Sequence, residues 1–413
     1  MTGVLRHILF VLENPLDPRD VERLGIARMI ARGIRVTAVD ASPFLRPKYK
    51  PVWHKQPARI EAELLTLRAE ADGKIFIAAA RTADLIVCVA GYTGSTRALR
   101  LYRWLTRVGK PYLVISAGAY PSPVAPPSGR RKIAERLADA LYRARFGRID
   151  PVRSILGRIP ARLLGIRPPD FVVLGGRLSL AAAANFPVSD KTRRIHAHSL
   201  DYDVFRAARD AKHDGKLPGA DFAVFIDEST GFQRDLLVAG PARQISPESF
   251  YPKLRFLFDR VEKELGLAVV IAGNPRADYS GMPGLFGERR VEYGATARLV
   301  TQSRLVLAHR STAIGYAVMA GKPVLQIATR EQYRHFMNKG PFDAFAQALN
   351  KPVQFIDAAG EADLGLAFQI DADRYAAYMR DYVKLPGTPD GLFWDVVLAE
   401  VERHLAQPSV RAT

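Results

Sequence analysis

The chain has 413 residues, 48% of them hydrophobic and 25% charged, which is the composition of a globular protein with a sizeable core. It has no apolar run of about 18 residues and only one cysteine, Cys88, so we expect no membrane-spanning helix, no disulfide framework and a cytoplasmic location. A net charge of +18 indicates an anionic partner, such as a phosphorylated substrate, an anionic lipid or nucleic acid.

Apolar runs alternate with helical patterns through the first half of the chain. Continuous apolar strands between amphipathic helices are typical of a parallel sheet covered on both faces. The predicted strands are residues 4–13, 34–42, 83–91 and 111–118, and the predicted helices are residues 17–33, 60–81 and 94–110.

The same alternation restarts after a polar, glycine-containing break near residues 208–220. We therefore expect an α/β fold with two doubly wound domains in tandem, residues 1–212 and 221–384. Residues 385–413 contain a final helix that we expect to pack back on the first domain. The strands predicted in the second half are residues 221–227, 267–273, 304–308 and 323–328, and the helices are residues 246–266, 295–303 and 313–321.

A basic segment, residues 129–168, interrupts the first domain. Between residues 130 and 167 it holds eleven Lys and Arg against three Asp and Glu, with apolar stripes at helical spacing. Such a segment is typical of helices that lie on anionic membranes, and we expect that contact here. The alternative is a solvated insertion whose stripe faces the core. We expect no nucleic acid partner, because few aromatic residues interleave the arginines and no binding motif appears.

Polar side chains gather where the apolar strands of the second domain stop. Helix caps explain one such case, but several on one sheet edge indicate a ligand site. The candidates are Asp227 and Glu228, then Asn274, Pro275 and Arg276, then His309, Arg310, Ser311 and Thr312.

The clearest mechanism belongs to Ser311 and Thr312. They precede a short helix of small residues, whose free N–H groups favour an anion. Arg310, His309 and Lys322 are close in sequence and would add positive charge. We predict a phosphate site, against the alternative of an ordinary helix cap.

The segment HRSTAIGYAVMAGKPVLQI, residues 309–327, resembles the late C-terminal part of GT-B glycosyltransferases. The order FIDES, IAGNPR and HRST resembles the acidic, His-Pro and Ser-Ser or Ser-Thr motifs of bacterial sialyltransferases and polysialyltransferases. Most of the chain is similar to glycosyltransferases of O-antigen and capsule gene clusters. The resemblance implies two Rossmann-like domains that face a cleft, with the nucleotide-sugar donor on the C-terminal one.

Two motifs depart from the sialyltransferase pattern. The acidic motif lacks its glycine, since Ser229 follows Glu228, and Asn274 replaces the histidine of His-Pro. An amide donates hydrogen bonds but carries neither charge nor a catalytic proton. Arg276 or Arg310 would then supply the positive charge, and the resemblance supports the transferase class better than a CMP-sugar donor.

Glycosyl transfer needs a base for the acceptor hydroxyl and stabilisation of the leaving phosphate. The candidate bases are Asp227, Glu228 and Asp17, with Glu13 beside the last. The alternatives are a helix cap at Asp17 and a structural ion pair at Asp227 or Glu228. We expect no metal and no cofactor, because the sequence offers no metal-binding DxD motif at a strand end and no third ligand for His196 and His198.

The resulting hypothesis is a metal-independent GT-B glycosyltransferase at the inner face of the cell membrane. It would move a sugar, with a CMP-activated acidic sugar as the first candidate, to a lipid-linked or growing surface polysaccharide. The alternatives are a nucleotide-sugar epimerase or hydrolase of GT-B layout, and a degenerate GT-B scaffold of a polysaccharide assembly complex.

Overall fold

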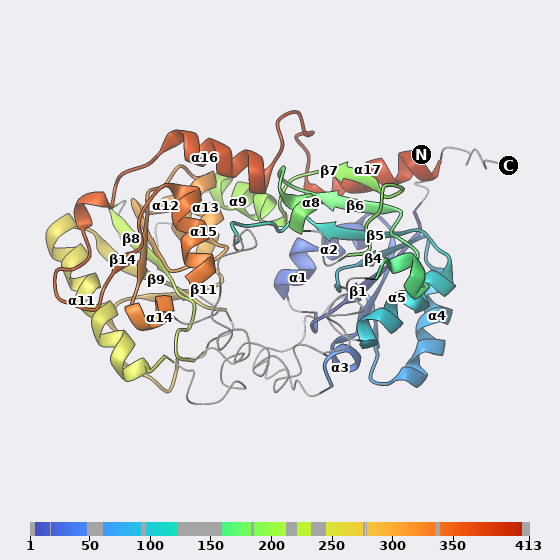
Figure 1. The fold of residues 1–413 in the computed structure, drawn as a ribbon, viewed down its shortest axis with the longest axis horizontal. Coiled ribbons are helices and arrows are strands. Elements are labelled where there is room, and N and C mark those ends of the chain that lie inside the picture. Colours follow the sequence, from blue (N-terminus) through green and yellow to red (C-terminus); the bar gives the residue numbers. More distant parts are fainter. Residues whose placement is uncertain are drawn as a thin grey trace. The chain divides into compact units, whose positions relative to one another are not determined.

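The computed structural model describes two compact units, each built on a parallel sheet (Figure 1). Among the described residues, the first unit takes those of Met1–Ala119, Arg131–Leu200 and Lys384–Thr413, and the second those of Tyr120–Arg130 and Asp201–Val383. The residues described are 5–16, 18–47, 61–91, 96–122, 159–182, 186–211, 221–232, 245–275, 277, 279–334 and 339–406.

The first unit has a seven-stranded sheet in the order β3-β2-β1-β4-β5-β6-β7, with every pair parallel. Its strands are β1 (His7–Leu12), β2 (Arg35–Asp40), β3 (Glu63–Thr66), β4 (Leu85–Cys88), β5 (Tyr112–Ser116), β6 (Phe171–Leu174) and β7 (Arg193–His196). Its helices are α1 (Pro18–Arg23), α2 (Ile26–Ala31), α3 (Ser42–Leu45), η1 (Glu70–Asp72), α4 (Gly73–Thr82), α5 (Thr96–Val108), η3 (Ala161–Leu164), α8 (Ser179–Ala182) and α17 (Phe393–Leu405).

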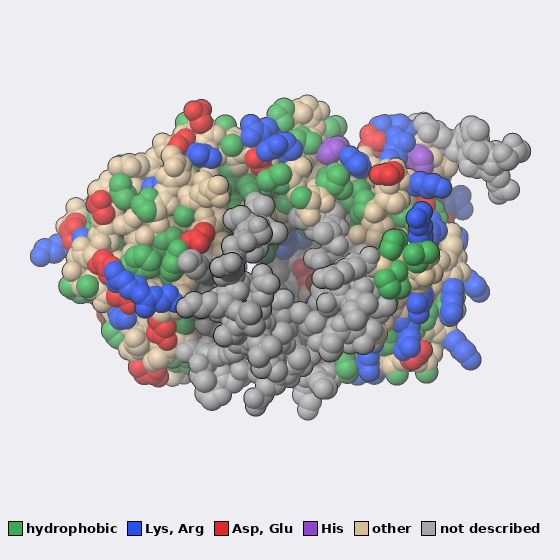
Figure 2. All heavy atoms as spheres, in the orientation of Figure 1, with side chains coloured by type: hydrophobic (Ala, Val, Ile, Leu, Met, Phe, Trp, Pro, Cys, Tyr) green, Lys and Arg blue, Asp and Glu red, His purple; other side chains and the backbone are tan. Residues whose placement is uncertain are grey.

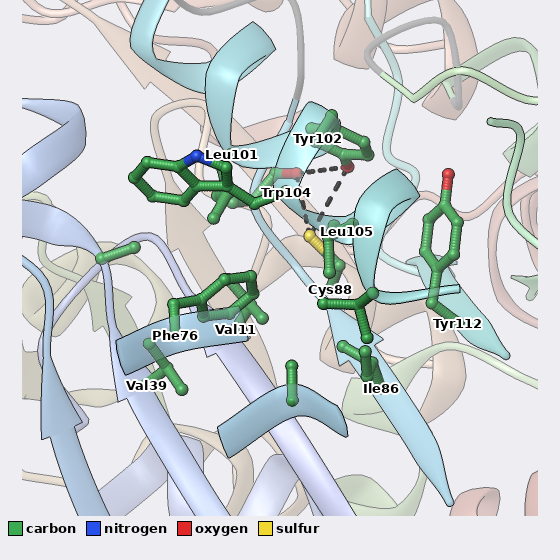
Figure 3. Packing of buried hydrophobic residues seen from close by; sticks show 14 of the residues in the cluster. Val11, Val39, Phe76, Ile86, Cys88, Leu101, Tyr102, Trp104, Leu105 and Tyr112 are labelled. Atoms are coloured by element: carbon green, nitrogen blue, oxygen red, sulfur yellow. Dashed lines mark hydrogen bonds between the residues drawn. The ribbon is translucent and has the colours of Figure 1, made fainter. Parts of the chain in front are cut away.

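Helices α4 and α5 and the turn η3 cover one face of this sheet. Their apolar side chains form a core with the strands, in which Trp104 packs on Phe76 (Figure 3). Cys88 lies in this core and its Sγ is 3.6 Å from the Tyr102 hydroxyl. Burial raises the pKa of Cys88 to about 11, so the thiol is an inert core group.

Helices α2 and α17 supply side chains to the core on the other face of the first sheet. In α17, Trp394 packs edge-on against Phe10 of β1 and its indole N–H donates to the Arg23 carbonyl at 3.0 Å. Gly25 has φ +63°, and a Cβ there would lie 2.4 Å from the Trp394 ring. The C-terminal helix is therefore part of the core of the first unit.

The second unit has a six-stranded parallel sheet in the order β11-β9-β8-β12-β13-β14. Its strands are β8 (Phe222–Ile226), β9 (Ala268–Gly273), β11 (Val291–Tyr293), β12 (Leu305–Ala308), β13 (Val324–Ala328) and β14 (Gln354–Phe355), with β10 (Leu285–Glu288) outside the sheet. Its helices are α9 (Leu200–Asp210), α11 (Pro247–Leu265), α12 (Thr296–Gln302), α13 (Ile314–Met319), α14 (Arg330–Arg334), α15 (Lys339–Leu349), η6 (Leu364–Leu366), α16 (Ala372–Tyr378) and η7 (Met379–Val383).

The fold class agrees with the prediction of two doubly wound α/β domains. Two details differ from the sequence expectation. Residues 63–66, predicted as part of a helix, form the edge strand β3, because parallel pairing with β2 outweighs the helical propensity of the segment. Helix α9 groups with the second unit, so the chain passes between the units at Leu200, before the expected break.

The basic segment predicted at residues 129–168 lies outside the described residues up to residue 158. Its described end is folded onto the first unit, where Leu164 and Ile166 are buried in the core. Arg167 forms an ion pair with Asp170 at 2.9 Å and stacks on the Tyr112 ring. Arg167 is therefore a structural residue of the first unit.

Candidate functional site at the switch point of the second sheet

Strand order reverses between β8 and β12 in the second sheet. The chain runs from β8 to β9 and β11 on one side, and then returns to β12 on the other side. In parallel α/β sheets, ligands bind beyond the carboxyl ends of the strands at such a reversal. The segments that follow the two strands, residues 227–230 and 309–312, form the candidate site.

Asp227 follows β8 directly and only 6% of its surface is exposed. Its Oδ1 accepts the Ser229 N–H at 2.8 Å, and its Oδ2 accepts the Asn274 N–H at 3.1 Å and the Tyr279 hydroxyl at 2.6 Å. Burial raises the pKa of Asp227, and the bond from Tyr279 is the largest of those that oppose the rise. Asp227 therefore ties the loop after β8 to the loop after β9.

The residues after Asp227 hold two further loops. Glu228 accepts the backbone N–H of Arg310 at 2.8 Å, which joins the ends of β8 and β12 across the switch point. The Thr230 hydroxyl accepts the side-chain amide of Gln332, from α14, at 3.2 Å, and its carbonyl accepts the Tyr251 hydroxyl at 3.1 Å. The loop after β8 is thus bonded to the loops after β9 and β12 and to helix α14.

Ser229 has a backbone φ of +50°, in the left-handed region that residues other than glycine rarely adopt. Its carbonyl accepts the Phe232 N–H at 2.9 Å, so a tight turn follows β8. Strained backbone of this kind persists where the surroundings fix it, and it is frequent at ligand sites.

His309 follows β12 and its ring is wholly buried between Phe225 and Phe250. Its Nδ1 lies 2.7 Å from the Ile327 carbonyl oxygen, which can only accept, so Nδ1 carries the proton. Burial lowers the pKa of His309, which favours the neutral ring. Its Nε2 then has no hydrogen bond partner among the described residues.

Arg310 is half-buried at the switch point, and its only hydrogen bond within the described part of the chain is made by its backbone N–H. Two other cations in the described part of this unit are paired: Arg330 with Glu361, and Lys253 with Asp357 at 3.0 Å. Of these three described cations, the Arg310 guanidinium is therefore the one that is available for an anionic ligand.

Ser311 and Thr312 lie in the turn before α13, rather than in the helix itself. The Ser311 hydroxyl accepts the Ala313 N–H at 3.2 Å, and the helix begins at Ile314 with Ala313 as its N-cap. The N–H groups of Ile314 and Gly315 bond to the carbonyls of Ser311 and Thr312. These backbone donors are used by the turn, whereas the Ser311 and Thr312 hydroxyls can still donate to a ligand.

The structure brings together only some of the predicted residues. Asn274 reaches the site, where its backbone N–H bonds to Asp227, and Pro275 follows it in the same turn. Arg276 and Asp17 lie outside the described residues.

The suggestion that Lys322 adds charge to this site is wrong. It precedes β13, and its pKa is lowered first by burial and then by the charge of Arg304, a residue directly before β12. Both residues therefore lie at the amino edge of the sheet, one strand length from Arg310.

The first sheet has a switch point of its own, between β1 and β4. There Glu13 follows β1 and pairs with Arg46 at 3.3 Å, and a second nitrogen of Arg46 donates to the Asn14 side chain at 3.3 Å. The cation at this switch point is neutralised within the unit.

Within the described ranges, no three His, Cys, Asp or Glu side chains come together as a metal site. His198 is fully buried and its Nε2 lies 3.1 Å from the Gly391 carbonyl. No helix in the same ranges has the length and apolar character needed to cross a bilayer.

Comparison with solved structures places this geometry in a known fold. CalG4, a calicheamicin glycosyltransferase, superposes with a TM-score of 0.53 at 15% identity, over 98% of this chain and 100% of that one. The chain has the GT-B fold. Strand orders of the 3-2-1-4-5-6 type in both units agree with the two Rossmann-like domains of GT-B proteins.

Two further GT-B matches are more distant. The wall teichoic acid polymerase TagF gives a TM-score of 0.47 at 10% identity, over 97% of this chain and 90% of that one. MnaA of S. aureus, in a co-structure with UDP, gives 0.48 at 12% identity, over 97% of both chains. No protein-family profile matches the sequence, and no curated protein matches it.

Sequence reasoning missed three residues that build the site. Tyr279, Thr230 and Gln332 bond to Asp227 or to each other, and all are at most 9% exposed. The polar residues at the end of β8 were visible in the sequence, but their partners lie 52 and 102 positions away. Only the three-dimensional pairing of the strands identifies these partners.

Proposed function

We propose that this protein is a metal-independent glycosyltransferase that binds its nucleotide-sugar donor at the switch point of the second unit. The observation that carries the proposal is the half-buried Arg310 guanidinium, which has no partner in the described part of the chain. A half-buried arginine at this position suits the phosphates of a nucleotide, because a guanidinium donates paired hydrogen bonds to phosphate oxygens.

The neighbours of Arg310 support this assignment. Glu228 fixes its backbone at 2.8 Å, which lowers the entropic cost of placing the guanidinium. The hydroxyls of Ser311 and Thr312 are the next polar groups along the chain, and either would donate to the same phosphate. His309 supports the site from the core, because its buried ring fixes the end of β12 against β13.

Transfer would proceed by attack of an acceptor hydroxyl on the anomeric carbon of the donor. The bond from that carbon to the phosphate oxygen breaks, and the nucleotide leaves with the electron pair while Arg310 stabilises its charge. The acceptor proton passes to a carboxylate. Glu228 is half-buried and suits this role better than Asp227, whose two oxygens are used by three hydrogen bonds.

The acceptor would be a lipid-linked saccharide or a growing surface polysaccharide. The support is the net charge of +18, which favours work beside an anionic membrane. We keep a CMP-activated acidic sugar as the first donor to test, because the order of the three motifs resembles that of the sialyltransferases.

Nucleotide binding tests the proposal directly. The full-length protein is titrated with CMP, UDP, GDP and dTDP in a calorimeter, and Arg310→Gln is compared with Arg304→Gln. Arg304 lies just before the other end of β12 and pairs with Asp221, so it provides a matched loss of charge. We expect Arg310→Gln to weaken binding by about 10- to 100-fold, the usual range for a charged hydrogen bond, and Arg304→Gln to leave it unchanged.

Three results would contradict the proposal. Failure of every nucleotide to bind would favour the scaffold alternative. Equal affinities of the Arg310→Gln variant and the unmodified protein would remove the phosphate from this site. Release of a free or epimerised sugar from the donor alone, without an acceptor, would indicate a hydrolase or an epimerase.

A further inference from the structure

One face of the first unit has a marked excess of basic residues. Helices α4 and α5 and the turn η3 cover the same side of the sheet, and α4 contacts α5. The Arg103 guanidinium donates to the Leu164 carbonyl at 2.8 Å, and the Arg167 N–H donates to the Thr106 hydroxyl at 2.9 Å, which joins η3 to α5. The outward sides of the three elements therefore form one surface, here called the α5 face.

The cations of the α5 face are largely unpaired. Helix α5 and the two residues after it contain five Lys and Arg residues and no Asp or Glu. Arg100 pairs with Glu70, but Lys74, Arg81 and Arg107 are exposed and make no ion pair or hydrogen bond with a described residue. The surface thus presents several charges that nothing in the described part of the unit neutralises.

Large apolar side chains are exposed on the same face. Leu163 of η3 is 71% exposed and Ile75 of α4 is 56% exposed. Figure 2 shows hydrophobic side chains with Lys and Arg side chains around them, over the part of the first unit where Figure 1 labels α4 and α5. Projecting apolar residues within a basic surface have the composition of membrane-associated helices.

The composition distinguishes a bilayer from the other anionic partners. Single-stranded nucleic acid is bound through aromatic side chains on which bases stack, and α5 directs its aromatic residues, Tyr102 and Trp104, into the core. An anionic bilayer needs only cations at headgroup depth and a few apolar side chains that enter the acyl boundary. Leu163 and Ile75 provide the second component.

We infer that the α5 face is a docking surface for a membrane that contains anionic phospholipid. Its described residues belong to α4, α5 and η3. Only η3 belongs to the basic segment of residues 129–168, whereas α4 and α5 lie outside that segment. The inference concerns the first unit and does not depend on nucleotide binding by the second.

Vesicle co-flotation of the full-length protein tests the inference. The vesicles are phosphatidylcholine with an equal amount of phosphatidylglycerol, compared with phosphatidylcholine alone. We expect binding only to the anionic vesicles, with an affinity that falls as salt is added. The double variant Arg81→Gln and Arg107→Gln should bind on the order of 30-fold more weakly, since each cation near the surface contributes a factor of about five.

The control removes the same charge from the second unit. Lys263 and Arg374 are exposed on α11 and α16, and the double variant Lys263→Gln and Arg374→Gln should bind as the unmodified protein does. Leu163→Ser should weaken binding several-fold with no change in circular dichroism, because the side chain is already exposed.

Three outcomes would overturn the inference. Equal losses in both double variants would indicate attraction to net charge rather than to this face. Unchanged binding by the variants of the α5 face would exclude it. Binding of single-stranded RNA in place of vesicles would assign the face to nucleic acid.

Discussion

The two sheets share a strand order around their switch points, but the arginines at these two points differ in their side-chain partners. In the first sheet Arg46 is neutralised by Glu13 at 3.3 Å, on the solvent side. In the second sheet the nearby Glu228 bonds to the backbone of Arg310 and leaves its guanidinium without a described partner. The same topology thus holds one arginine that is paired and one whose guanidinium has no described partner. The strand order predicts where a ligand binds, and single side chains decide which ligand it is.

Removal of the buried carboxylate at Asp227 should give the largest effect. Asp227→Ala leaves the Tyr279 hydroxyl and the N–H groups of Ser229 and Asn274 without their acceptor, and each unsatisfied buried donor costs about 1–3 kcal/mol. We expect the free energy of unfolding in urea to fall by about 3 kcal/mol or more.

Glu13→Ala at the first switch point is the matched test. Its ion pair with Arg46 is exposed, so the loss should stay below about 1 kcal/mol. Similar losses of unfolding free energy in the two variants would show that Asp227 stabilises the fold no more than a surface carboxylate does.

The second test uses the acid sensitivity of His309. Because burial lowers its pKa in the folded protein, the unfolded chain binds the proton more readily. The stability it contributes is present above the unfolded pKa of about 6.5 and is lost as the pH falls through the folded pKa, at up to about 1.4 kcal/mol per pH unit. His309→Phe should therefore show a weaker loss of stability between pH 7 and pH 5, measured by urea unfolding.

His7 in the first unit sharpens that test. It is also buried with a lowered pKa, but Thr37 bonds to its Nε2 at 2.9 Å and Arg35 to its Nδ1 at 2.8 Å. Phenylalanine at position 7 would remove both of these hydrogen bonds, so His7→Phe should lose stability at every pH. A parallel shift of the whole pH profile in His309→Phe would mean that its ring contributes only packing.

The smallest effect should come from the strained turn after β8. Ser229→Gly relieves a positive φ and should raise the free energy of unfolding by at most about 1 kcal/mol, partly offset by the greater freedom of glycine in the unfolded chain. Asn350 also has positive φ, but asparagine tolerates that region, so Asn350→Gly should change stability less. A loss in Ser229→Gly would show that its side chain, not its backbone, stabilises the turn.

The sequence was a good guide to the strands and a poor guide to the contacts between them. Apolar runs such as residues 304–308 identified buried strands, because side chains enclosed on both faces of a sheet must be apolar. Proximity in the sequence was misleading for Lys322. Helix α13, six residues long, and the turn after it separate Lys322 from Arg310, so that Lys322 lies at the opposite edge of the sheet. It also could not reveal that Glu228 would bond to Arg310, 82 positions away.

The prediction for the edge strand β3 was wrong for a different reason. Its exposed Leu64 and half-buried Leu65 fit a helical pattern as well as an extended one. Pairing with β2 decides between them, and that pairing depends on a neighbour more than twenty residues away. Local propensity is weakest at such edges, where only one side of the strand is paired.

Because α17 packs on the first unit, that unit is built from segments that are separated in the sequence by the second unit. The second unit is nearly one continuous stretch, Asp201–Val383, between two parts of the first. A gene fragment that stops near Leu200 would encode the first sheet without Trp394 and the rest of α17, and so without part of one face of its core. An internal deletion that joins Leu200 to Lys384 through a short linker is therefore the rational route to the first unit in isolation.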